Sequence, residues 1–367
     1  DGVHDDVNKT IWSALSWQPD APPREILLEY TRCFFGANVA EEAADGILAL
    51  EKNWEGGIAE NGGIQATFEL WQKLEAKAPE LRGNWRWQLC LLRAYYDAFI
   101  RQRLINETAL ERAANEALAT APSRGANAAM DAALTILKRA ESQPIKQDWR
   151  KRIEDLCADL FKSIKLQTSV AKYHASGSER GAVLDFVDHP LNNRRWLEAE
   201  FARIGKLPTE SERLKQLELI RTWENPGPGS FYDAVGDIDK SPHTIRGEGV
   251  NTDPMMERNP NPGYWMSGDG ASPRRLSWYA TADWPIGLQY HGLDPAAKYR
   301  VRLSGYGQMK LRLNGQLGTP NVPRIEIGET MEFPVPAELI KDGQLKLTFD
   351  KLPDEASLNW RKQSRVC

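Results

Sequence analysis

The chain has 367 residues, of which 41% are hydrophobic and 27% charged, and its formal net charge is −4. A chain of this size and composition can bury the cores of two or three globular domains. Lysine and arginine form no cluster, which argues against a partner with a phosphate backbone such as a nucleic acid. The sequence contains no run of about 18 apolar residues and so no candidate for a membrane-spanning helix.

The N-terminal part, residues 1–222, has the periodicity of amphipathic helices joined by short polar connections. From residue 84 the apolar side chains recur with a 4-3-4-3 spacing that places them on one helix face: Trp85, Leu89, Leu92, Tyr96 and Phe99. Residues 153–164 repeat this pattern. Further helices are expected over four ranges: 107–120, 126–141, 191–204 and 208–223. Short connections favour antiparallel neighbours, so we expect a helical bundle over residues 1–222.

Local signals set the expected ends of two helices near the N-terminus. The helix in PREILLEYTRCFF is expected to begin at Pro22 and Pro23 and to end at Gly36. Asn38, followed three residues later by Glu41, predicts a capping box at the start of the next helix.

After residue 243 the hydrophobic period changes to the period of two that is typical of β-strands. In KYRVRL and QLKLTF apolar and polar residues alternate, and MKLRLNGQL contains Asn314 and Gly315, a pair that predicts a two-residue hairpin turn. Further strands are expected in LSWYATAD, GLQYHGL, RIEIG and MEFPVP. We therefore expect residues 244–367 to form an antiparallel β-sandwich of jelly-roll or galactose-binding-like type.

The period changes within RTWENPGPGSFYDAVGDIDKSPH, residues 221–243, of which we assign 223–243 to a connector between the two domains. Its three prolines and three glycines argue against regular structure, but Trp223, Phe231 and Tyr232 are not typical of a flexible linker. Burial of these rings would offset the entropy lost on ordering the segment. We therefore expect a packed connector rather than a hinge.

The connector contains the first group of candidate ligand-binding residues: Trp223, Glu224, Tyr232 and Asp233. An indole beside a carboxylate can stack on the C–H face of a sugar ring and accept hydrogen bonds from its hydroxyl groups. The same residue types are also typical of a polar and aromatic seam between two domains. Both interpretations stay open at the level of the sequence.

A second group lies in KYHASGSERGAVLDFVDHPLNNRRW, residues 172–196, which is rich in polar side chains. The candidate ligand-binding residues of this segment are Tyr173, His174, Glu179, Arg180, Asn192, Asn193 and Arg194. Such a mixture can hydrogen-bond a polyhydroxylated ligand, and the carboxylates could serve in acid–base chemistry if a cleft holds them apart. Alternatively, the segment is a long connection whose polar groups satisfy its own backbone and cap the neighbouring helices.

The four cysteines, Cys33, Cys90, Cys157 and Cys367, form no CxxC pair, and the first three lie in apolar helical patterns. We expect these three to be free, buried thiols. The five histidines lack the spacing of metal ligands, so neither a metal nor another cofactor is expected. No GxSxG, Walker or HExxH motif is present, and the sequence therefore identifies no catalytic residue.

The N-terminal segment DGVHDDVNKTIWSALSWQPDAPPREILLEYTRCFFG resembles a region of bacterial polysaccharide-degrading enzymes of the α-glucuronidase and hexosaminidase-like type. In that region a (β/α)8 barrel passes into a helical domain: DDxNK-like residues follow the last barrel strand, and a helix ending in EYxRxFFG opens the bundle. NWRWQLCLLRAYYDAF and RTWENPGPGSFYDAVGD are similar to segments of large bacterial glycoside-hydrolase-like proteins. The resemblance implies that this chain is a fragment and that a catalytic barrel precedes Asp1 in the same polypeptide.

Three functions from different classes are compatible with these observations. The first, implied by the resemblance and in keeping with the 13 tryptophans, is the accessory part of a glycoside hydrolase, which supports the barrel and contacts carbohydrate. The second is a stand-alone, non-catalytic carbohydrate-binding protein that uses the sandwich, with expected stacking residues Trp265, Trp278, Trp284 and Tyr290. The third is a structural scaffold without a ligand. Polysaccharide handling indicates a periplasmic or secreted protein, whereas cysteines without a disulfide framework do not favour export, so the localisation stays open.

Overall fold

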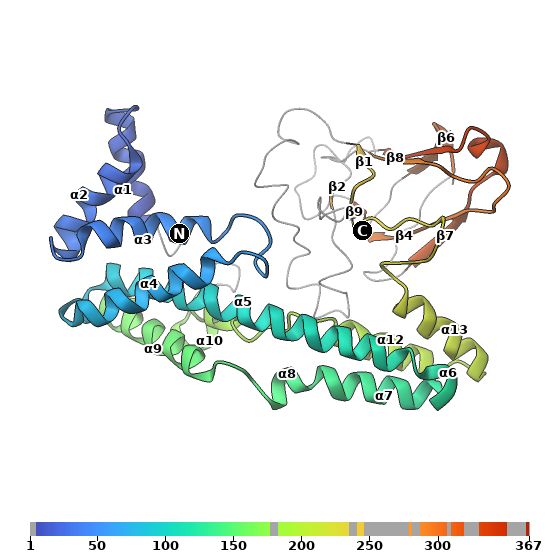
Figure 1. Cartoon of the computed structure of the whole chain (residues 1–367), viewed down its shortest axis with the longest axis horizontal. Coiled ribbons are helices and arrows are strands. Elements are labelled where there is room, and N and C mark those ends of the chain that lie inside the picture. The colour runs from blue at the N-terminus through green and yellow to red at the C-terminus, as the bar shows by residue number, and fades with distance from the viewer. Residues whose placement is uncertain are drawn as a thin grey trace. The chain divides into compact units, whose positions relative to one another are not determined.

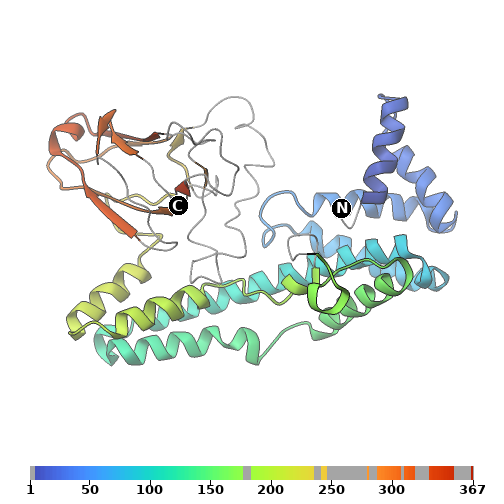
Figure 2. The same cartoon turned by 180° about the vertical axis from the view of Figure 1, so that it is seen from behind.

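The computed structural model describes residues 5–176, 183–234, 241–245, 279–280, 287–306, 310–318, 330–350 and 365–366. Within these ranges helices form the N-terminal part and antiparallel strands the C-terminal part, as the change in hydrophobic period predicts (Figure 1). Figure 2 shows the same chain from behind. Several residues of interest lie outside the described ranges: Glu179, Arg180, Trp265, Trp278, Trp284 and the expected strand RIEIG.

The helical elements, with 3₁₀ helices written η, are α1 (Asp5–Trp17), α2 (Pro23–Phe35), α3 (Ala40–Lys52), α4 (Gly63–Lys77), η1 (Pro79–Gly83), α5 (Trp85–Leu118), α6 (Ala121–Arg124), α7 (Ala126–Leu137), α8 (Arg139–Ser142), α9 (Gln147–Ile164), α10 (Val170–Tyr173), α11 (Val183–Phe186), α12 (Arg194–Gly205) and α13 (Glu210–Arg221). α5 is one continuous helix where the periodicity predicts two, because neither proline nor glycine interrupts it. None of the helices in the described ranges is both long enough and apolar enough to span a membrane.

The chain divides into two compact units, which we call the first and the second unit. The first comprises Asp1–Ala109 and Arg139–Leu191, and the second comprises Leu110–Lys138 and Asn192–Cys367. This division does not coincide with residue 222, since the second unit contains α7, α12 and α13 in addition to the strands. The domain boundaries at residues 222 and 243 stay a prediction.

The predicted ends of α2 are confirmed, and the predicted capping box of α3 is wrong. Pro22 is the N-cap of α2, and Gly36 ends the helix with a φ of 89° while its N–H donates to a carbonyl of the last turn. α3 begins after Val39, and no side chain caps it. Val39 and Ala40 are each only 1% exposed, so packing into the core, rather than a cap at Asn38, sets the start of this helix.

The core of the first unit surrounds two buried tryptophans. Trp71 of α4 and Trp87 of α5 are fully buried, and their ring centroids lie 5.3 Å apart in an edge-to-face arrangement. Phe35 packs edge-on against Trp87 at 5.0 Å. The Trp71 indole donates to the carbonyl of Gly46 at 3.2 Å, which satisfies the polar atom of this buried ring. The predicted apolar stripe of α5 is confirmed, since Leu89, Leu92 and Phe99 are buried in this core and Trp85 and Tyr96 pack against it.

A separate core in the second unit joins α7, α12 and α13. α7 contributes small side chains that allow close approach of the helices, including Ala126, Ala129 and Ala133, and α12 contributes the larger Trp196 and Phe201. α13 starts with a capping box, in which the Thr209 hydroxyl accepts from the backbone of Glu212 and the Glu212 carboxylate accepts from the backbone of Thr209. The sequence pattern predicted this motif at the start of α3 instead.

The strands are β1 (Thr244–Ile245), β2 (Tyr279–Ala280), β3 (Gly287–His291), β4 (Arg300–Tyr306), β5 (Lys310–Leu313), β6 (Gln316–Leu317), β7 (Thr330–Pro334), β8 (Gln344–Asp350) and β9 (Arg365–Val366), with η5 (Ala337–Ile340) before β8. Within the described ranges, one sheet has the order β1-β3-β8-β5-β6 and the other β2-β9-β4-β7, and every pairing is antiparallel. One buried cluster draws residues from both sheets, including Leu303 and Phe333 of the second and Leu311 and Leu347 of the first.

The predicted hairpin is confirmed. Asn314 and Gly315 have φ values of 47° and 79°, and both positive values are those of the tight turn that an Asn-Gly pair favours. β5 and β6 pair on either side of this turn. The Asn314 side chain also donates to the Leu339 carbonyl at 2.6 Å and accepts from the Lys346 backbone at 2.7 Å. The turn therefore anchors the neighbouring β8 in addition to closing the hairpin.

The expectation of three buried thiols is correct for two cysteines and wrong for the third. Cys90 and Cys157 are free and buried, whereas Cys33 is free but exposed. Cys33 follows Arg32 on the face of α2 that points away from the core, which the apolar neighbours in the sequence do not reveal. Burial raises the pKa of the Cys90 thiol to about 12 and that of Cys157 to about 11.

We predict that iodoacetamide at mildly alkaline pH modifies Cys33 and spares Cys90 and Cys157 in the folded chain. The two buried thiols are shielded and, because their pKa values are raised, are present almost entirely as the unreactive thiol form. Peptide mapping by mass spectrometry measures the modification at each site. In denaturant all three should react at similar rates, and modification of Cys90 or Cys157 at the rate of Cys33 under native conditions would contradict the prediction.

Candidate functional site

A hollow with a volume of about 770 Å³ lies in the second unit, where α13 passes into the connector. Its lining residues, which define what we call the connector hollow, are Asn115, Arg221, Thr222, Asn225, Gly227, Pro228, Gly229 and Ser230. The volume lies within the range of about 300–1,000 Å³ that is typical of small-molecule sites. Seven of these residues belong to the irregular stretch of residues 221–243.

The local sequence explains why the chain opens a hollow here. α13 ends at Arg221, and Pro226 and Pro228 cannot continue a helix or join a strand ladder as donors. Gly227 and Gly229 have φ values of 108° and 73°, which L-residues with a side chain rarely adopt. The chain therefore turns twice within a few residues and leaves space beside the end of α13.

The lining of the connector hollow is polar and presents groups of different kinds. Asn115 on α5 is engaged by the fold, because its amide donates to the Arg221 carbonyl at 3.3 Å. Asn225 and Ser230 are exposed, and neither side chain has a hydrogen-bond partner among the described residues. An amide and a hydroxyl can each donate and accept, so the hollow offers hydrogen bonds suited to a ligand that also does both.

The charge at the rim of the connector hollow is balanced. The Arg221 guanidinium donates to the Glu218 carboxylate with Nε at 2.7 Å. This hydrogen bond holds the pKa of Glu218 below its usual value and raises that of Arg221. Both groups stay ionised at neutral pH and neutralise each other. The hollow therefore favours an uncharged, polar ligand over an anion.

The first group of predicted residues flanks the lining residues of the hollow in the sequence, and the fold engages Trp223 and Asp233. Trp223 is half-buried and packs edge-on against the buried Trp196 at 5.5 Å, as part of the helical core of the second unit. Glu224 is exposed, and Tyr232 is half-buried. Asp233 is turned inward, with only 2% of its side chain exposed. Trp223 and Asp233 thus have structural roles that the sequence could not separate from ligand binding.

Asp233 holds the end of the connector against β3. Its carboxylate accepts from the His243 backbone at 3.2 Å and from the Tyr290 hydroxyl at 3.0 Å, and its oxygens lie 3.0 and 3.2 Å from His243 Nδ1. Ser241 donates a further hydrogen bond at 3.2 Å. The rings of Phe231, His243 and Tyr290 pack against one another with centroids 4.8 to 5.2 Å apart. We call these five residues the Asp233 clasp.

The second group of predicted residues is divided between the two units. Tyr173 and His174 belong to the first unit, and Asn192, Asn193 and Arg194 belong to the second. Tyr173 stacks on Phe161 of α9 with ring centroids 4.6 Å apart, while His174 is exposed at the end of α10.

The asparagines of this group serve the fold. The buried Asn193 donates from its backbone to the Glu111 carboxylate at 3.1 Å, and its side-chain amide also donates to Glu111. The Asn192 side chain accepts from the backbone of Arg194 at 3.1 Å, at the start of α12. Both contacts satisfy backbone groups that a helix start leaves without partners. These residues support the interpretation of the segment as a helix connection.

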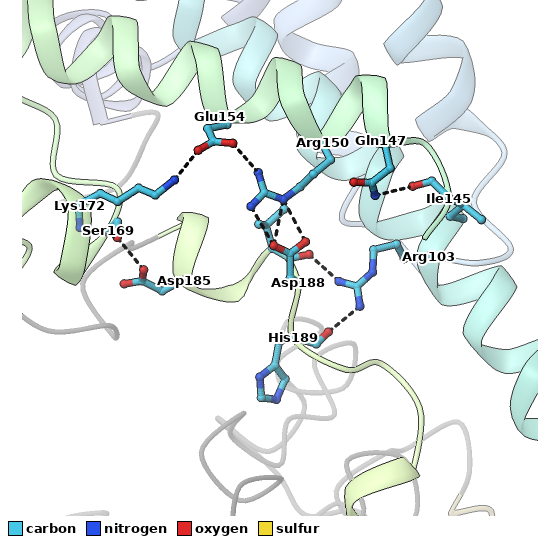
Figure 3. Close-up of polar contacts among 11 residues, drawn as sticks. Arg103, Ile145, Gln147, Arg150, Glu154, Ser169, Lys172, Asp185, Asp188 and His189 are labelled. Atoms are coloured by element: carbon cyan, nitrogen blue, oxygen red, sulfur yellow. Dashed lines mark hydrogen bonds and ion pairs between the residues drawn. The ribbon is translucent and has the colours of Figure 1, made fainter. Parts of the chain in front are cut away.

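The polar residues between these two ends hold the segment onto α5 and α9, as Figure 3 shows. Arg150 of α9 donates twice to the Asp188 carboxylate with its Nε and once with Nη2, at 2.8–3.0 Å. Arg103 of α5 donates to the carbonyls of Val187 and His189, and Asp185 accepts from Ser169 at 2.7 Å. In Figure 3 the His189 ring points away from this network. Asp188 and Asp185, the carboxylates of the segment in the part that the structure describes, are thus paired with a cation and a hydroxyl donor rather than arranged as an acid–base pair.

The candidates predicted from the sequence do not include four of the lining residues: Asn115, Arg221, Asn225 and Ser230. Asn225 and Ser230 could have been found, since they are the polar residues among the prolines and glycines of the connector. Asn115 lies about a hundred residues earlier on α5, and no local pattern marks it. Within the described ranges no three His, Cys, Asp or Glu side chains gather as metal ligands would.

Comparison of the chain with models of protein families, with curated proteins and with solved structures found no match. A functional hypothesis therefore rests on the geometry of the connector hollow and on the resemblance in the sequence.

Proposed function

We propose that this chain is the accessory part of a polysaccharide-degrading glycoside hydrolase, and that the connector hollow binds carbohydrate. A catalytic barrel would lie upstream in the same polypeptide, as the N-terminal resemblance implies. The observation that carries the binding proposal is the pair of unengaged polar side chains, Asn225 and Ser230, in a hollow of about 770 Å³. Sugar hydroxyl groups both donate and accept, as these side chains do.

The rest of the site is consistent with an uncharged sugar. Arg221 is neutralised by Glu218, so the guanidinium orients a ligand without selecting an anion. Gly227 and Gly229 carry no side chain, which lets a ligand approach the backbone closely. We also propose that the two antiparallel sheets, which share one buried cluster, form a jelly-roll or galactose-binding-like sandwich.

Isothermal titration calorimetry of the whole chain with a panel of neutral oligosaccharides tests the proposal. We expect binding that weakens roughly tenfold in the double variant Asn225→Ala and Ser230→Ala, because two hydrogen bonds of about 0.5–1.5 kcal/mol each are removed. Asn127→Ala is the matched control, since Asn127 is exposed on α7 of the same unit and does not line the hollow. An unchanged affinity in the double variant would contradict binding at the hollow.

A structural role is the second candidate, and the inward-facing residues favour it. Asp233, Asn193 and Asp188 are all occupied by contacts within the fold. A scaffold without a ligand should bind none of the oligosaccharides, so the same titration separates the two functions. We expect no hydrolysis of aryl glycosides by this chain alone, and turnover would instead place an active site within it.

A further inference from the structure

The helix α1 carries two exposed tryptophans on the side that faces away from the core. Trp12 is 75% exposed and Trp17 is 87% exposed, although an indole is among the side chains that gain most from burial. The other side of the helix belongs to the fold, since Val7 is buried and Ile11 packs against the core of the first unit. α1 packs along α2 in this way (Figure 1). The fold therefore uses one face of α1, and the tryptophans lie outside it.

The N-terminal end of α1 is fixed to two other helices. The Asp6 carboxylate accepts from the Tyr30 hydroxyl of α2 at 2.7 Å and from Arg86 Nε of α5 at 2.6 Å. The Arg86 guanidinium also lies over the rings of Phe34 and Trp85, 3.8 and 4.0 Å from their centroids. α1 thus presents its exposed face in a fixed orientation, which reduces the entropy lost when a partner binds.

The two tryptophans flank a pair of small side chains. With 3.6 residues per turn, the five-residue spacing places the indoles about 140° apart around the helix and about 7.5 Å apart along it. Ser13 and Ser16 lie in the arc between them, and both are exposed. The Ser16 hydroxyl donates to the Trp12 carbonyl at 2.8 Å, so the helix itself satisfies this polar group. The face thus has large apolar side chains at its edges and small ones at its centre.

This pattern is complementary to itself. Two copies of α1 can lie antiparallel about a two-fold axis that crosses the face midway between Trp12 and Trp17. Trp12 of one copy then faces Ser16 of the other, and Trp17 faces Ser13. Each large side chain meets a small one, as a knob meets a hole, and both contacts occur twice because a two-fold interface uses the same patch on both copies.

The charges at the two ends of the face favour the antiparallel arrangement over a parallel one. Lys9 lies three residues before Trp12, and Asp20 lies three residues after Trp17, in the turn that follows the helix. Both side chains are exposed. An antiparallel pair brings Lys9 of each copy toward Asp20 of the other, whereas a parallel pair places like charges together. Complementary charges of this kind set the register and orientation of an interface.

We propose that the exposed face of α1 is the interface of a weak, two-fold symmetric dimer of this chain. Burial of the four indoles of two copies removes on the order of 600–1,000 Å² from water. This area is close to the lower limit of about 1,000 Å² for a specific interface, and the serines and the charged ends add to it. Interfaces of this size form transient complexes, so we expect a Kd on the order of tens of micromolar. The inference does not depend on the proposed function, because α1 belongs to the first unit and the connector hollow to the second.

Sedimentation equilibrium of the whole chain tests the dimer over a concentration range of about 1–500 µM, which brackets the expected Kd. The average mass should rise from that of the monomer toward that of the dimer. We expect the double variant Trp12→Ser and Trp17→Ser to dimerise at least tenfold more weakly, because tryptophan anchors carry much of the energy of an interface. The variant should fold, since both rings are exposed. Trp54→Ser is the matched control, because Trp54 is 53% exposed in the same unit and lies outside α1.

Exchange of the two charges tests the orientation of the helices. Lys9→Asp alone should weaken the dimer severalfold, because two carboxylates then face each other at each end. Addition of Asp20→Lys should restore the affinity, since the pair is re-formed with its signs exchanged. Both substitutions suit the helix itself, because an acid near its N-terminus and a base near its C-terminus complement the helix dipole.

Each outcome of these experiments decides between the alternatives. A chain that stays monomeric at every concentration overturns the proposal, and so does a dimer that the double tryptophan variant leaves intact. An equal loss in Trp54→Ser indicates unspecific contact between exposed indoles and also overturns it. A charge-exchanged variant that dimerises no better than Lys9→Asp overturns the antiparallel arrangement. A monomeric chain that sediments with phosphatidylcholine vesicles only while Trp12 and Trp17 are present overturns the dimer and assigns the face to a lipid surface.

Discussion

Replacement of Trp87 by alanine is expected to lower the free energy of unfolding of the first unit by about 3–5 kcal/mol. Trp87 is fully buried, and it contacts Phe35 at 5.0 Å and Trp71 at 5.3 Å. Its removal forfeits the transfer free energy of the indole and leaves a cavity that three helices border. The surrounding rings are held by their own contacts, such as the hydrogen bond from Trp71 to Gly46, so they cannot move far into the space.

Urea unfolding followed by far-ultraviolet circular dichroism measures this effect. The control is Trp17→Ala, because Trp17 is 87% exposed at the end of α1 and its loss should change stability by less than about 0.5 kcal/mol. Because both variants remove a tryptophan from the same unit, a difference between their stability losses reports the effect of burial and not of residue type. A loss below about 1 kcal/mol in Trp87→Ala would mean that the two rings do not form the centre of this core.

Local sequence signals predicted the local features of the fold. The Pro22–Pro23 start and the Gly36 end of α2 depend on backbone geometry within a few residues, and so does the turn at Asn314. The change of period near residue 243 also falls where β1 begins, at Thr244. Each of these features is determined by neighbours in the chain, which is why the sequence suffices.

Features that depend on tertiary packing could not be predicted in this way. The start of α3 follows from burial of Val39 rather than from a cap at Asn38, and the exposure of Cys33 follows from how α2 packs. The connector hollow requires Asn115 of α5 to meet Arg221 at the end of α13. In the first unit, Asn53 after α3 donates to the buried Asp97 of α5. The residues in each of these contacts lie far apart in the chain, so no sequence periodicity indicates that they meet.

The second large loss of stability is expected in the Asp233 clasp, which holds the end of the connector against β3. We expect Asp233→Ala to destabilise the second unit by about 3 kcal/mol, because several donors lose a buried acceptor at once. Among them are the Tyr290 hydroxyl at 3.0 Å and the His243 backbone at 3.2 Å. With no carboxylate to hold it, the connector should also separate more often from β3.

Limited proteolysis with chymotrypsin measures that separation, since Phe231 and Tyr232 in the connector are cleavage sites for this protease. We expect cleavage there to accelerate in Asp233→Ala in proportion to the loss of stability, because the protease cuts the opened form. Ser230→Ala is the control, as Ser230 is exposed in the same connector and its side chain has no hydrogen-bond partner among the described residues. If Asp233→Ala were cut no faster than Ser230→Ala, the connector would be a hinge. The hollow beside it would then lack the fixed wall that hydrogen bonding to a sugar requires, so the clasp bears on function as well as on stability.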